Sequence, residues 1–411
     1  ETAEVKKDTQ VRYLGGVKSP ILTEVKKSDK VTVLEDEDDW MKVATADGYV
    51  GYIKTKFLKN QKKEKISRDF TEPVYSDMTE DHSINMAWHN VTNAAANNAV
   101  LASTSGLTTI APTWFSLADT EGNISSIADA DYVNYAHTAG LEVWAVFRDF
   151  HGGTNSYDET YETLRYTSKR AKLEDQVVAA AVAAGVDGIN LDFELISSKC
   201  GVHYVQLVRE LSVKCHQNNL VFSVDNYVPQ SYNSHYDLKE QGIVADYVVI
   251  MAYDEHTEGS YEAGSVASIS YLQDGIEKTL KKVSADKVIA GIPFFTRLWF
   301  ETAKSSEQLS EEAGTEAASY PNKVSSKALG MEEAAQSVVN AGATAQWDEK
   351  TQQNYAKWSA DGGTYRIWLE DAQSLEAKLK VIQGNKLAGV AEWSLGREES
   401  SVWKLISQYV N

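Results

Sequence analysis

The fold of this chain is decided by a stretch of eight residues, Asp187-Gly188-Ile189-Asn190-Leu191-Asp192-Phe193-Glu194. Side chains along an extended strand point alternately to its two faces. Asn190, Asp192 and Glu194 therefore share one face, while Ile189, Leu191 and Phe193 share the other. This alternation predicts a barrel strand whose apolar face packs on helices and whose polar face points into the barrel interior.

Polar side chains inside a barrel are costly, because burying one without a partner costs several kcal/mol. Glu194 comes last in the stretch, at the carboxyl end of the strand, where barrel enzymes build their active sites. Asp192 lies roughly 6.6 Å deeper along the strand. We expect its negative charge to raise the pKa of Glu194 and to keep that side chain protonated. The alternative is a structural carboxylate pair satisfied by Arg or Tyr.

Seven other apolar segments are predicted to be strands, with helical segments between most of them. They are Ile84–Val91, Leu107–Phe115, Leu141–Phe147, Leu220–Val228, Tyr247–Tyr253, Val288–Phe295 and Leu387–Trp393. Together with Val186–Glu194 they predict an α/β fold, a (β/α)8 TIM barrel over residues 73–411. This segment is longer than the ~250 residues typical of the fold. The excess lies in residues 300–367, which we predict to be a small α+β insertion between strands seven and eight.

Four sequence motifs in the barrel segment resemble those of glycoside hydrolase family 18, the chitinase-like hydrolases. The eight-residue stretch matches the family signature D-G-x-[DN]-x-D-x-E, and Met251-Ala252-Tyr253-Asp254 resembles its M-x-Y-D. Gly291-Ile292-Pro293-Phe294-Phe295-Thr296-Arg297-Leu298-Trp299 resembles its G-x-P-x-[YF]-x-R-x-W, and Ala391-Glu392-Trp393 stands where the family has its final-strand Trp. The resemblance covers residues 80–411 and is nearest to the bacterial branch that includes spore-cortex and cell-wall N-acetylglucosaminidases.

This resemblance implies cleavage of a β-linked N-acetylglucosamine polymer with retention of configuration, without a metal or any other cofactor. Glu194 would protonate the glycosidic oxygen while the acetamido oxygen of the substrate attacks. Asp192 would orient the acetamido group and Tyr253 would hydrogen-bond it, which makes these three the catalytic candidates. The substrate-binding candidates are Asn190, Asp254, Arg297, Trp393, Trp114 and Tyr227. Trp114 and Tyr227 are included because they fall near predicted strand ends, where each could stack on a sugar or pack in the barrel.

Asn190 departs from the commoner family pattern, which has Asp at this position. An amide cannot take up a proton from Asp192 or share one with it. We therefore expect any proton relay to stop at Asp192, which would shift the pH optimum without abolishing activity.

Residues 9–58 have the pattern of short strands separated by polar turns, with Asp47-Gly48 as a hairpin turn. The segment from Asp39 to Ile53 resembles the W-x-x-V…G-x-x-G-Y-[VI] signature of bacterial Src-homology-3 (SH3)-like domains. This implies a small all-β SH3-like barrel over residues 1–60 that binds a cell-wall peptide or glycan. The alternative is a barrel that acts only as a spacer. Residues 61–72 are predicted to be a linker.

Charge is distributed unevenly along the chain, whose formal net charge is −19. Residues 1–66 hold 14 basic and 12 acidic side chains, so the remaining 345 residues hold 26 basic and 47 acidic ones. An acidic body repels nucleic acid and anionic membranes but tolerates neutral polysaccharides. We therefore expect an N-acetylglucosamine-containing polysaccharide as the partner, no nucleic acid, and a monomer. The alternative is that the acidity serves solubility alone.

The sequence as a whole predicts a glycoside hydrolase that cleaves β-1,4-linked N-acetylglucosamine glycans of peptidoglycan or a related cell-wall polymer. Two alternatives stay open: a chitinase, and a lectin that binds such glycans without cleaving them. Lectin-like relatives usually lack the acid that this chain has at Glu194. The chain starts at Glu1 without an initiator Met, and we expect an upstream signal or anchor to have been removed. The expected location is extracellular or at the cell surface and cell wall.

Overall fold

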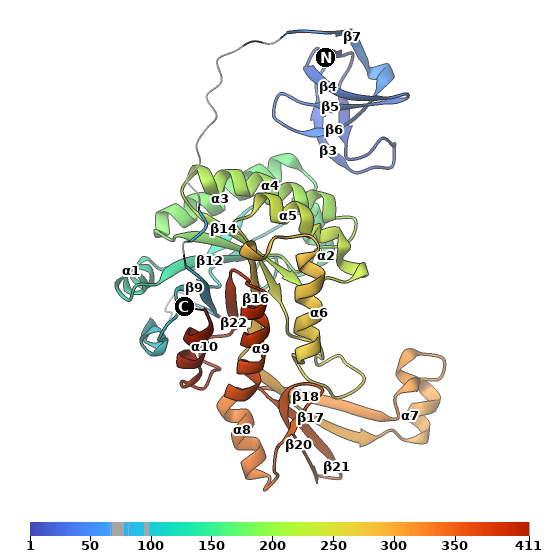
Figure 1. Ribbon diagram of the computed structural model, residues 1–411. Helices are drawn as coiled ribbons and strands as arrows, with labels where there is room; N and C mark the ends of the chain where they lie inside the picture. The colour runs from blue at the N-terminus through green and yellow to red at the C-terminus, as the bar shows by residue number, and fades with distance from the viewer. Residues whose placement is uncertain (66, 68–77, 81, 94–97, 411) are drawn as a thin grey trace.

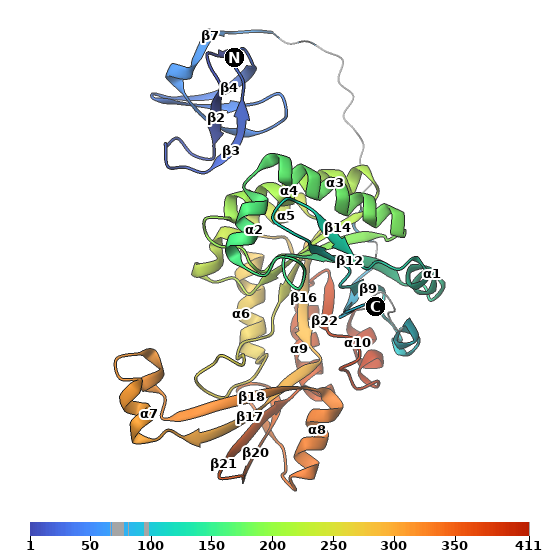
Figure 2. The ribbon, with the colours of Figure 1, turned by 180° about the vertical axis from the view of Figure 1, so that it is seen from behind.

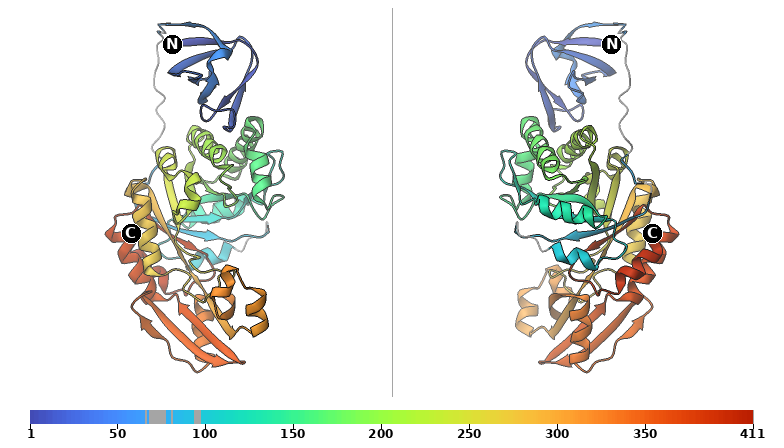
Figure 3. Two further views of the ribbon diagram at one scale, coloured as in Figure 1. Left: turned by 90° about the vertical axis from the view of Figure 1, so that its right-hand side faces the viewer. Right: turned by 90° about the vertical axis from the view of Figure 1, so that its left-hand side faces the viewer.

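The computed structural model describes residues 1–65, 67, 78–80, 82–93 and 98–410, in three parts (Figure 1). An antiparallel β-domain forms the N-terminal part, a closed parallel barrel surrounded by helices forms the body, and a second antiparallel sheet is inserted late in the chain. The N-terminal domain and the inserted sheet lie at opposite ends of the body (Figures 2 and 3). This architecture confirms the predicted fold class.

The N-terminal domain is built from the seven strands of one described sheet, in the order β3-β2-β6-β5-β4-β1-β7. The strands are β1 (Thr2–Val5), β2 (Thr9–Arg12), β3 (Ile21–Val25), β4 (Lys30–Glu37), β5 (Trp40–Ala44), β6 (Val50–Lys54) and β7 (Leu58–Lys62), with the short helix η1 (Thr55–Phe57) before the last. Alternate residues such as Val11, Val43 and Ile53 fill its core, as the period of two requires.

The sheet of the N-terminal domain runs two residues into the predicted linker. Strand β7 ends at Lys62 and pairs with β1 through the backbone, with Thr2 opposite Lys62. Because this pairing is made by backbone groups, it leaves no apolar pattern in the exposed side chains of Asn60–Lys62. Residues 66 and 68–72 of the predicted linker lie outside the described residues.

The body is a barrel of eight parallel strands within the described chain. They are β8 (Ile84–His89), β9 (Thr109–Pro112), β12 (Glu142–Arg148), β13 (Gly188–Asp192), β14 (Val221–Tyr227), β15 (Tyr247–Met251), β16 (Val288–Pro293) and β22 (Gly389–Trp393). Strand β9 pairs with both β8 and β12, and these two ladders close the sheet on itself. Seven of these strands lie within predicted apolar segments, and β12 runs one residue beyond its predicted end at Phe147, to Arg148.

Helices cover the outside of this barrel (Figure 1). They are α1 (Ala130–Thr138), α2 (Tyr157–Leu164), α3 (Thr167–Ala184), α4 (Gly201–Gln217), α5 (Leu238–Val244), α6 (Ile269–Leu280), α9 (Ala372–Gly384) and α10 (Val402–Val410), with the 3-10 turns η2 (Asn98–Ser103), η3 (Ser231–Tyr236) and η4 (Ala285–Lys287) and the short strands β10 (Phe115–Leu117) and β11 (Ile124–Ser126) between barrel elements. Helix α3 ends at Gly185, whose φ of 74° suits a residue without a Cβ, and the chain then enters β13. No helix in the described part of the chain is long and apolar enough to cross a membrane.

Strand β13 has the two faces that its sequence predicts. Ile189, Leu191 and Phe193 belong to the apolar core between the strands and the helices. Asn190 faces the other way and is hydrogen-bonded to Trp88 and Ser223 on other barrel strands. The polar face of the stretch therefore lies inside the barrel, as expected.

The insertion is a five-stranded antiparallel sheet, as far as the structure describes it, in the order β18-β17-β21-β20-β19. Its elements are β17 (Phe295–Ala303), α7 (Ser306–Glu311), η5 (Glu316–Ser319), β18 (Asn322–Gly330), α8 (Met331–Asn340), β19 (Gln346–Asp348), β20 (Gln353–Ala360) and β21 (Gly363–Leu369). The sheet starts five residues before the predicted boundary at residue 300. The apolar run continues from β16 directly into β17, so the sequence shows no break where the chain leaves the barrel.

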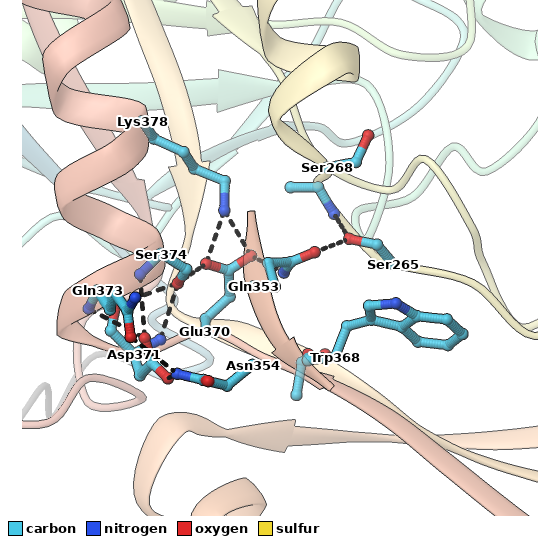
Figure 4. A network of polar contacts seen from close by, with 12 residues as sticks. Ser265, Ser268, Gln353, Asn354, Trp368, Glu370, Asp371, Gln373, Ser374 and Lys378 are labelled. Atoms are coloured by element: carbon cyan, nitrogen blue, oxygen red, sulfur yellow. Dashed lines mark hydrogen bonds and ion pairs between the residues drawn. The ribbon is translucent and has the colours of Figure 1, made fainter. Parts of the chain in front are cut away.

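A buried polar network ties the insertion to the barrel (Figure 4). The Lys378 ammonium on α9 contacts both carboxylate oxygens of Glu370 at 2.8 Å, and both side chains are at most 1% exposed. Gln353 on β20 donates to Glu370 at 2.7 Å, and Ser265, in the loop before α6, donates to Gln353. A buried ion pair is favourable only when further hydrogen bonds satisfy it, and Gln353 and Ser374 supply them here.

Candidate active site

A pocket of about 170 Å³ opens at the carboxyl ends of the barrel strands. Six of the nine predicted site residues line it, namely Glu194, Asp192, Tyr253, Asp254, Trp393 and Tyr227, together with Trp88, Asn90, Arg148, Phe150, His151, Asp225 and Met251. Inward-facing positions at the ends of parallel strands converge at this edge of a barrel, which explains why residues far apart in sequence meet here.

Glu194 lies two residues after the end of β13, and the turn that carries it is held by Asp149, the residue after β12. The backbone N–H groups of Glu194 and Leu195 donate to the two carboxylate oxygens of Asp149 at 2.9 and 3.0 Å. Thr160 on α2 also donates to Asp149, at 3.1 Å. Asp149 was not predicted from the sequence, although a carboxylate directly after a predicted strand is a signal that could have found it.

Burial raises the pKa of the Glu194 carboxyl, and the negative charge of Asp254 adds to this rise. The Tyr227 hydroxyl opposes it by donating a hydrogen bond to Glu194. The pKa of Glu194 is raised, as expected from the sequence. The main cause is burial, whereas we expected the negative charge of Asp192 to be responsible. Burial is the largest cause because the lining of the pocket removes most of the water around the Glu194 carboxyl.

Asp192 lies deeper in the pocket and is 7% exposed. Burial raises the pKa of its carboxyl well above the ordinary value, and the charges of Glu194, Asp225 and Asp149 add to the rise. Arg148, its register neighbour on β12, acts in the opposite direction. Arg148 and Asp225 were not predicted from the sequence, because their proximity to Asp192 depends on how the strands align.

Asn190 is buried and does not line the pocket. Its side chain is 0% exposed; it accepts from Trp88 Nε1 at 3.0 Å and donates to Ser223 Oγ at 2.9 Å and to Asp225 Oδ1 at 2.7 Å. The structure does not place Asn190 among the residues that line the pocket, and its hydrogen bonds go to Trp88 on β8 and to Ser223 and Asp225 on β14, so its binding of substrate stays a prediction. Asn190 supports the residues above it.

Two further predicted residues do not line the pocket as the structure describes it. Trp114 is 2% exposed and packs edge-to-face on Tyr132 of α1 at 5.2 Å, in the core between the strands and the helices. Trp114 has the same parity as Ile110, which lies in that core, whereas Ala111 faces the barrel interior, so the alternation along the chain directs Trp114 outward. Arg297 lies on β17 and donates to Ser326 on β18 at 2.9 Å, yet it is near enough for its charge to oppose the raised pKa of Asp254.

Aromatic rings and an acid thus surround the pocket. Trp88 lies 6.0 Å from Trp393 and 6.3 Å from Tyr253 between ring centroids, each in an edge-to-face arrangement. Flat rings beside carboxyl groups suit a sugar, whose apolar ring face stacks while its hydroxyls take hydrogen bonds. Among the residues that the structure describes, no three His, Cys, Asp or Glu are grouped so as to hold a metal ion.

A (β/α)8 barrel with a buried acid at the end of its fourth strand, in a pocket lined by tryptophan and tyrosine, has the features of a glycosidase. The chain belongs to the glycosyl hydrolases family 18, whose family model matches residues 87–398. A bacterial SH3 domain matches residues 6–59. Both resemblances predicted from the sequence are confirmed, and the protein is a glycosidase.

Curated relatives of the chain occur in Bacillus subtilis (strain 168). The uncharacterized glycosylase YvbX is 25% identical over 69% of this chain and 80% of its own length. The cortical fragment-lytic enzyme is 27% identical over 60% of this chain and 54% of its own length, so the match spans about half of that relative.

Solved structures share the fold at low sequence identity. The spore cortex-lytic enzyme SleL of Bacillus megaterium QM B1551 superposes with a TM-score of 0.66 at 20% identity, covering 80% of this chain and 74% of that one. A chitinase from Chromobacterium violaceum ATCC 12472 gives a TM-score of 0.67 at 21% identity, covering 79% and 98%. These likenesses establish the common barrel architecture.

Proposed function

We propose that this glycosidase cleaves β-1,4-linked N-acetylglucosamine glycans of the bacterial cell wall by substrate-assisted catalysis. The observation that carries the proposal is the meeting of Glu194, Asp192 and Tyr253 in one pocket, where burial raises the pKa of the Glu194 carboxyl. A raised pKa favours the protonated form of a carboxyl group, which is the form that acts as a general acid. The N-terminal SH3 domain and the cortex-lytic relative support a wall glycan as the substrate.

In the proposed reaction, Glu194 donates its proton to the glycosidic oxygen while the acetamido oxygen of the substrate attacks the anomeric carbon. The bond to the leaving sugar breaks and an oxazolinium ion forms. Asp192 accepts a hydrogen bond from the acetamido N–H, and Tyr253 hydrogen-bonds the same group. The Glu194 carboxylate then takes a proton from water, which attacks the anomeric carbon from the side of the departed group. Configuration is therefore retained.

The other residues of the pocket are proposed to hold the sugar. Trp393 stacks on the ring that carries the acetamido group, while Asp254 and Tyr227 contact hydroxyls at the rim. Arg297 is proposed to act on Asp254, whose pKa its positive charge lowers. Neither Asn190 nor Trp114 is given a contact with the substrate, because both are buried away from the pocket.

We also propose that residues 1–60 bind the cell wall. A hollow of about 200 Å³ on this domain is lined by Thr9, Gln10, Arg12, Val17, Trp40, Lys54 and Phe57. Two cations beside two aromatic rings suit a peptide that carries carboxylates, as wall peptides do. This binding implies an extracellular or cell-surface location, and we expect the protein to act there as a monomer.

The replacement Glu194→Gln tests the catalytic proposal. It removes the proton donor and keeps the shape of the side chain, so the release of reducing ends from N-acetylglucosamine oligomers should fall at least ~100-fold. Asp36→Asn on β4, a replacement in the N-terminal domain, is the control and should keep the wild-type rate. If Glu194→Gln retains that rate as well, the assignment of the acid fails.

A chitinase is the second candidate, favoured by the shared fold of the Chromobacterium violaceum chitinase. Mass spectrometry of the products from purified peptidoglycan and from chitin, digested side by side, separates the two. We expect fragments from peptidoglycan at the faster rate. Faster cleavage of chitin would assign the enzyme to the alternative substrate.

A further inference from the structure

Three charged side chains lie side by side in the barrel, just below Glu194. Arg148 on β12 pairs in register with Asp192 on β13, and Leu191 pairs with Val224, which places Asp225 of β14 beside Asp192. These three residues are at most 8% exposed. One guanidinium thus accompanies two buried carboxyl groups, and nothing in the proposed reaction has used Asp225.

The hydrogen bonds of this layer leave one oxygen of each carboxyl group free. Asp225 Oδ1 accepts from the Asn190 amide at 2.7 Å, whereas Asp225 Oδ2 and Asp192 Oδ1 are buried without a hydrogen-bond partner within the described residues. A buried carboxylate oxygen without a donor is costly, and two adjacent carboxylates cannot both be ionised cheaply. A single proton placed on either carboxyl group relieves both costs and leaves the layer neutral with Arg148.

Asn190 decides which group can share that proton. Its amide is held on both sides, since it accepts from Trp88 and donates to Ser223 and Asp225. An amide is not basic enough to take the proton, but its bond to Asp225 fixes the orientation of that carboxyl group. Strand β13 thus has an amide at Asn190 instead of a carboxyl group, and the neighbouring strand β14 has a carboxyl group, Asp225, beside it.

We propose that Asp225 is the proton-sharing partner of Asp192, a positioning residue that supplies from β14 the acid that Asn190 does not supply on β13. The inference rests on the proposed function. As the acetamido N–H of the substrate approaches, the proton on Asp192 passes to Asp225. Asp192 is then a carboxylate that accepts the N–H and faces the positive oxazolinium ion, while Asp225 is neutral. The proton returns when the product leaves, so the step needs no other reactant.

This proposal replaces the expectation that a relay would stop at Asp192. Burial raises the pKa of Asp225 to about 8, so a neutral Asp225 near pH 7 is consistent with the geometry. The titratable and charged groups that interact with the pair from the surrounding elements are Glu194 after β13, Arg148 and Asp149 from β12, Tyr204 on α4, Tyr227 on β14 and Tyr253 after β15.

The test is the pH profile of Asp225→Asn, measured with the N-acetylglucosamine tetramer and the full chain. We expect kcat to fall about tenfold or more with KM little changed. The acid limb of the profile should move to lower pH, because the charge that raises the pKa of Asp192 is gone. Asp246→Asn is the structural control: this buried aspartate accepts the Phe222 N–H at 2.8 Å, so the replacement should lower stability and leave the profile unchanged.

The double variant Asn190→Asp/Asp225→Asn moves the carboxyl group back to β13 without changing the charge. The logarithm of its kcat should lie at least halfway from the value of the single variant to that of the wild type. A wild-type rate and profile for Asp225→Asn, or a double variant no more active than the single one, would overturn the proposal while Glu194→Gln still supports the function. If the wild-type protein does not cleave the tetramer at all, both the proposed function and the proposed role of Asp225 are overturned.

Discussion

Tyr227 donates a hydrogen bond to Glu194, and we expect this bond to set the pH range over which the proposed acid works. A hydroxyl that donates to a carboxylate favours the charged form, so it lowers the pKa of Glu194 against the effect of burial. In Tyr227→Phe this opposition is gone and the pKa rises further. Because the acid must be protonated, the alkaline limb of kcat/KM should move to higher pH, which a pH–rate profile measures. A limb that stays in place or moves to lower pH would contradict this role of Tyr227.

At the scale of single residues, the sequence predicted those side chains whose position follows from the strand they lie on. The alternation along β13 placed Asp192 and Glu194 on the pocket side and Phe193 on the helix side, as the structure does. Asp149 and Asp225 could not be found in this way. The position of Asp225 beside Asp192 depends on the register between neighbouring strands, which one sequence does not contain, whereas Asp149 stands directly after a predicted strand and could have been found by that signal.

At the scale of elements, the buried pair of Lys378 and Glu370 fixes the insertion to α9 (Figure 4). Lys378→Met should lower the free energy of unfolding by about 3–5 kcal/mol, because the Glu370 carboxylate is then left buried without its cation. Urea unfolding followed by tryptophan fluorescence measures the change. Lys380→Met, two residues away on the same helix, is the control: Lys380 is 60% exposed and pairs with Glu376, so its loss should cost less than about 1 kcal/mol. Equal losses in the two variants would show that the network does not hold the insertion.

The eight barrel strands were predictable because each is a short apolar run between polar or helical segments, a pattern that survives in one sequence. The start of the insertion was not predictable, because the apolar run that marks a strand does not stop there. Phe294 and Phe295 continue the apolar run of β16 into β17, and only the change of pairing partner from β22 to β18 marks the boundary. Strand β7 shows the opposite case, a strand with three exposed polar residues that backbone pairing holds in place.

At the scale of the whole molecule, the SH3 domain is docked on the barrel at the end away from the insertion (Figure 3). Tyr49 of the domain donates to Glu210 on α4 at 2.8 Å, and Thr167 at the start of α3 donates to the backbone oxygen of Leu22 at 3.0 Å. Burial raises the pKa of the Tyr49 hydroxyl to about 12, so it stays a donor at neutral pH. These contacts hold the two domains together, while the hollow around Trp40 and the pocket around Glu194 share no lining residue.

Separate sites on one chain predict that binding to the wall and cleavage can be separated by mutation. Trp40 lines the hollow, and Lys54 lies over its ring at 5.5 Å. Trp40→Ala should weaken binding to sedimented cell walls about tenfold or more, since a tryptophan in a pocket is a typical binding hot spot. The rate on soluble N-acetylglucosamine oligomers should stay unchanged, whereas the rate on whole walls should fall because the domain no longer concentrates the enzyme there. Leu34→Ala, at a side chain 48% exposed on β4, is the matched control. If Trp40→Ala sediments with walls as wild type does, the SH3 domain is a spacer and the wall is reached through the barrel alone.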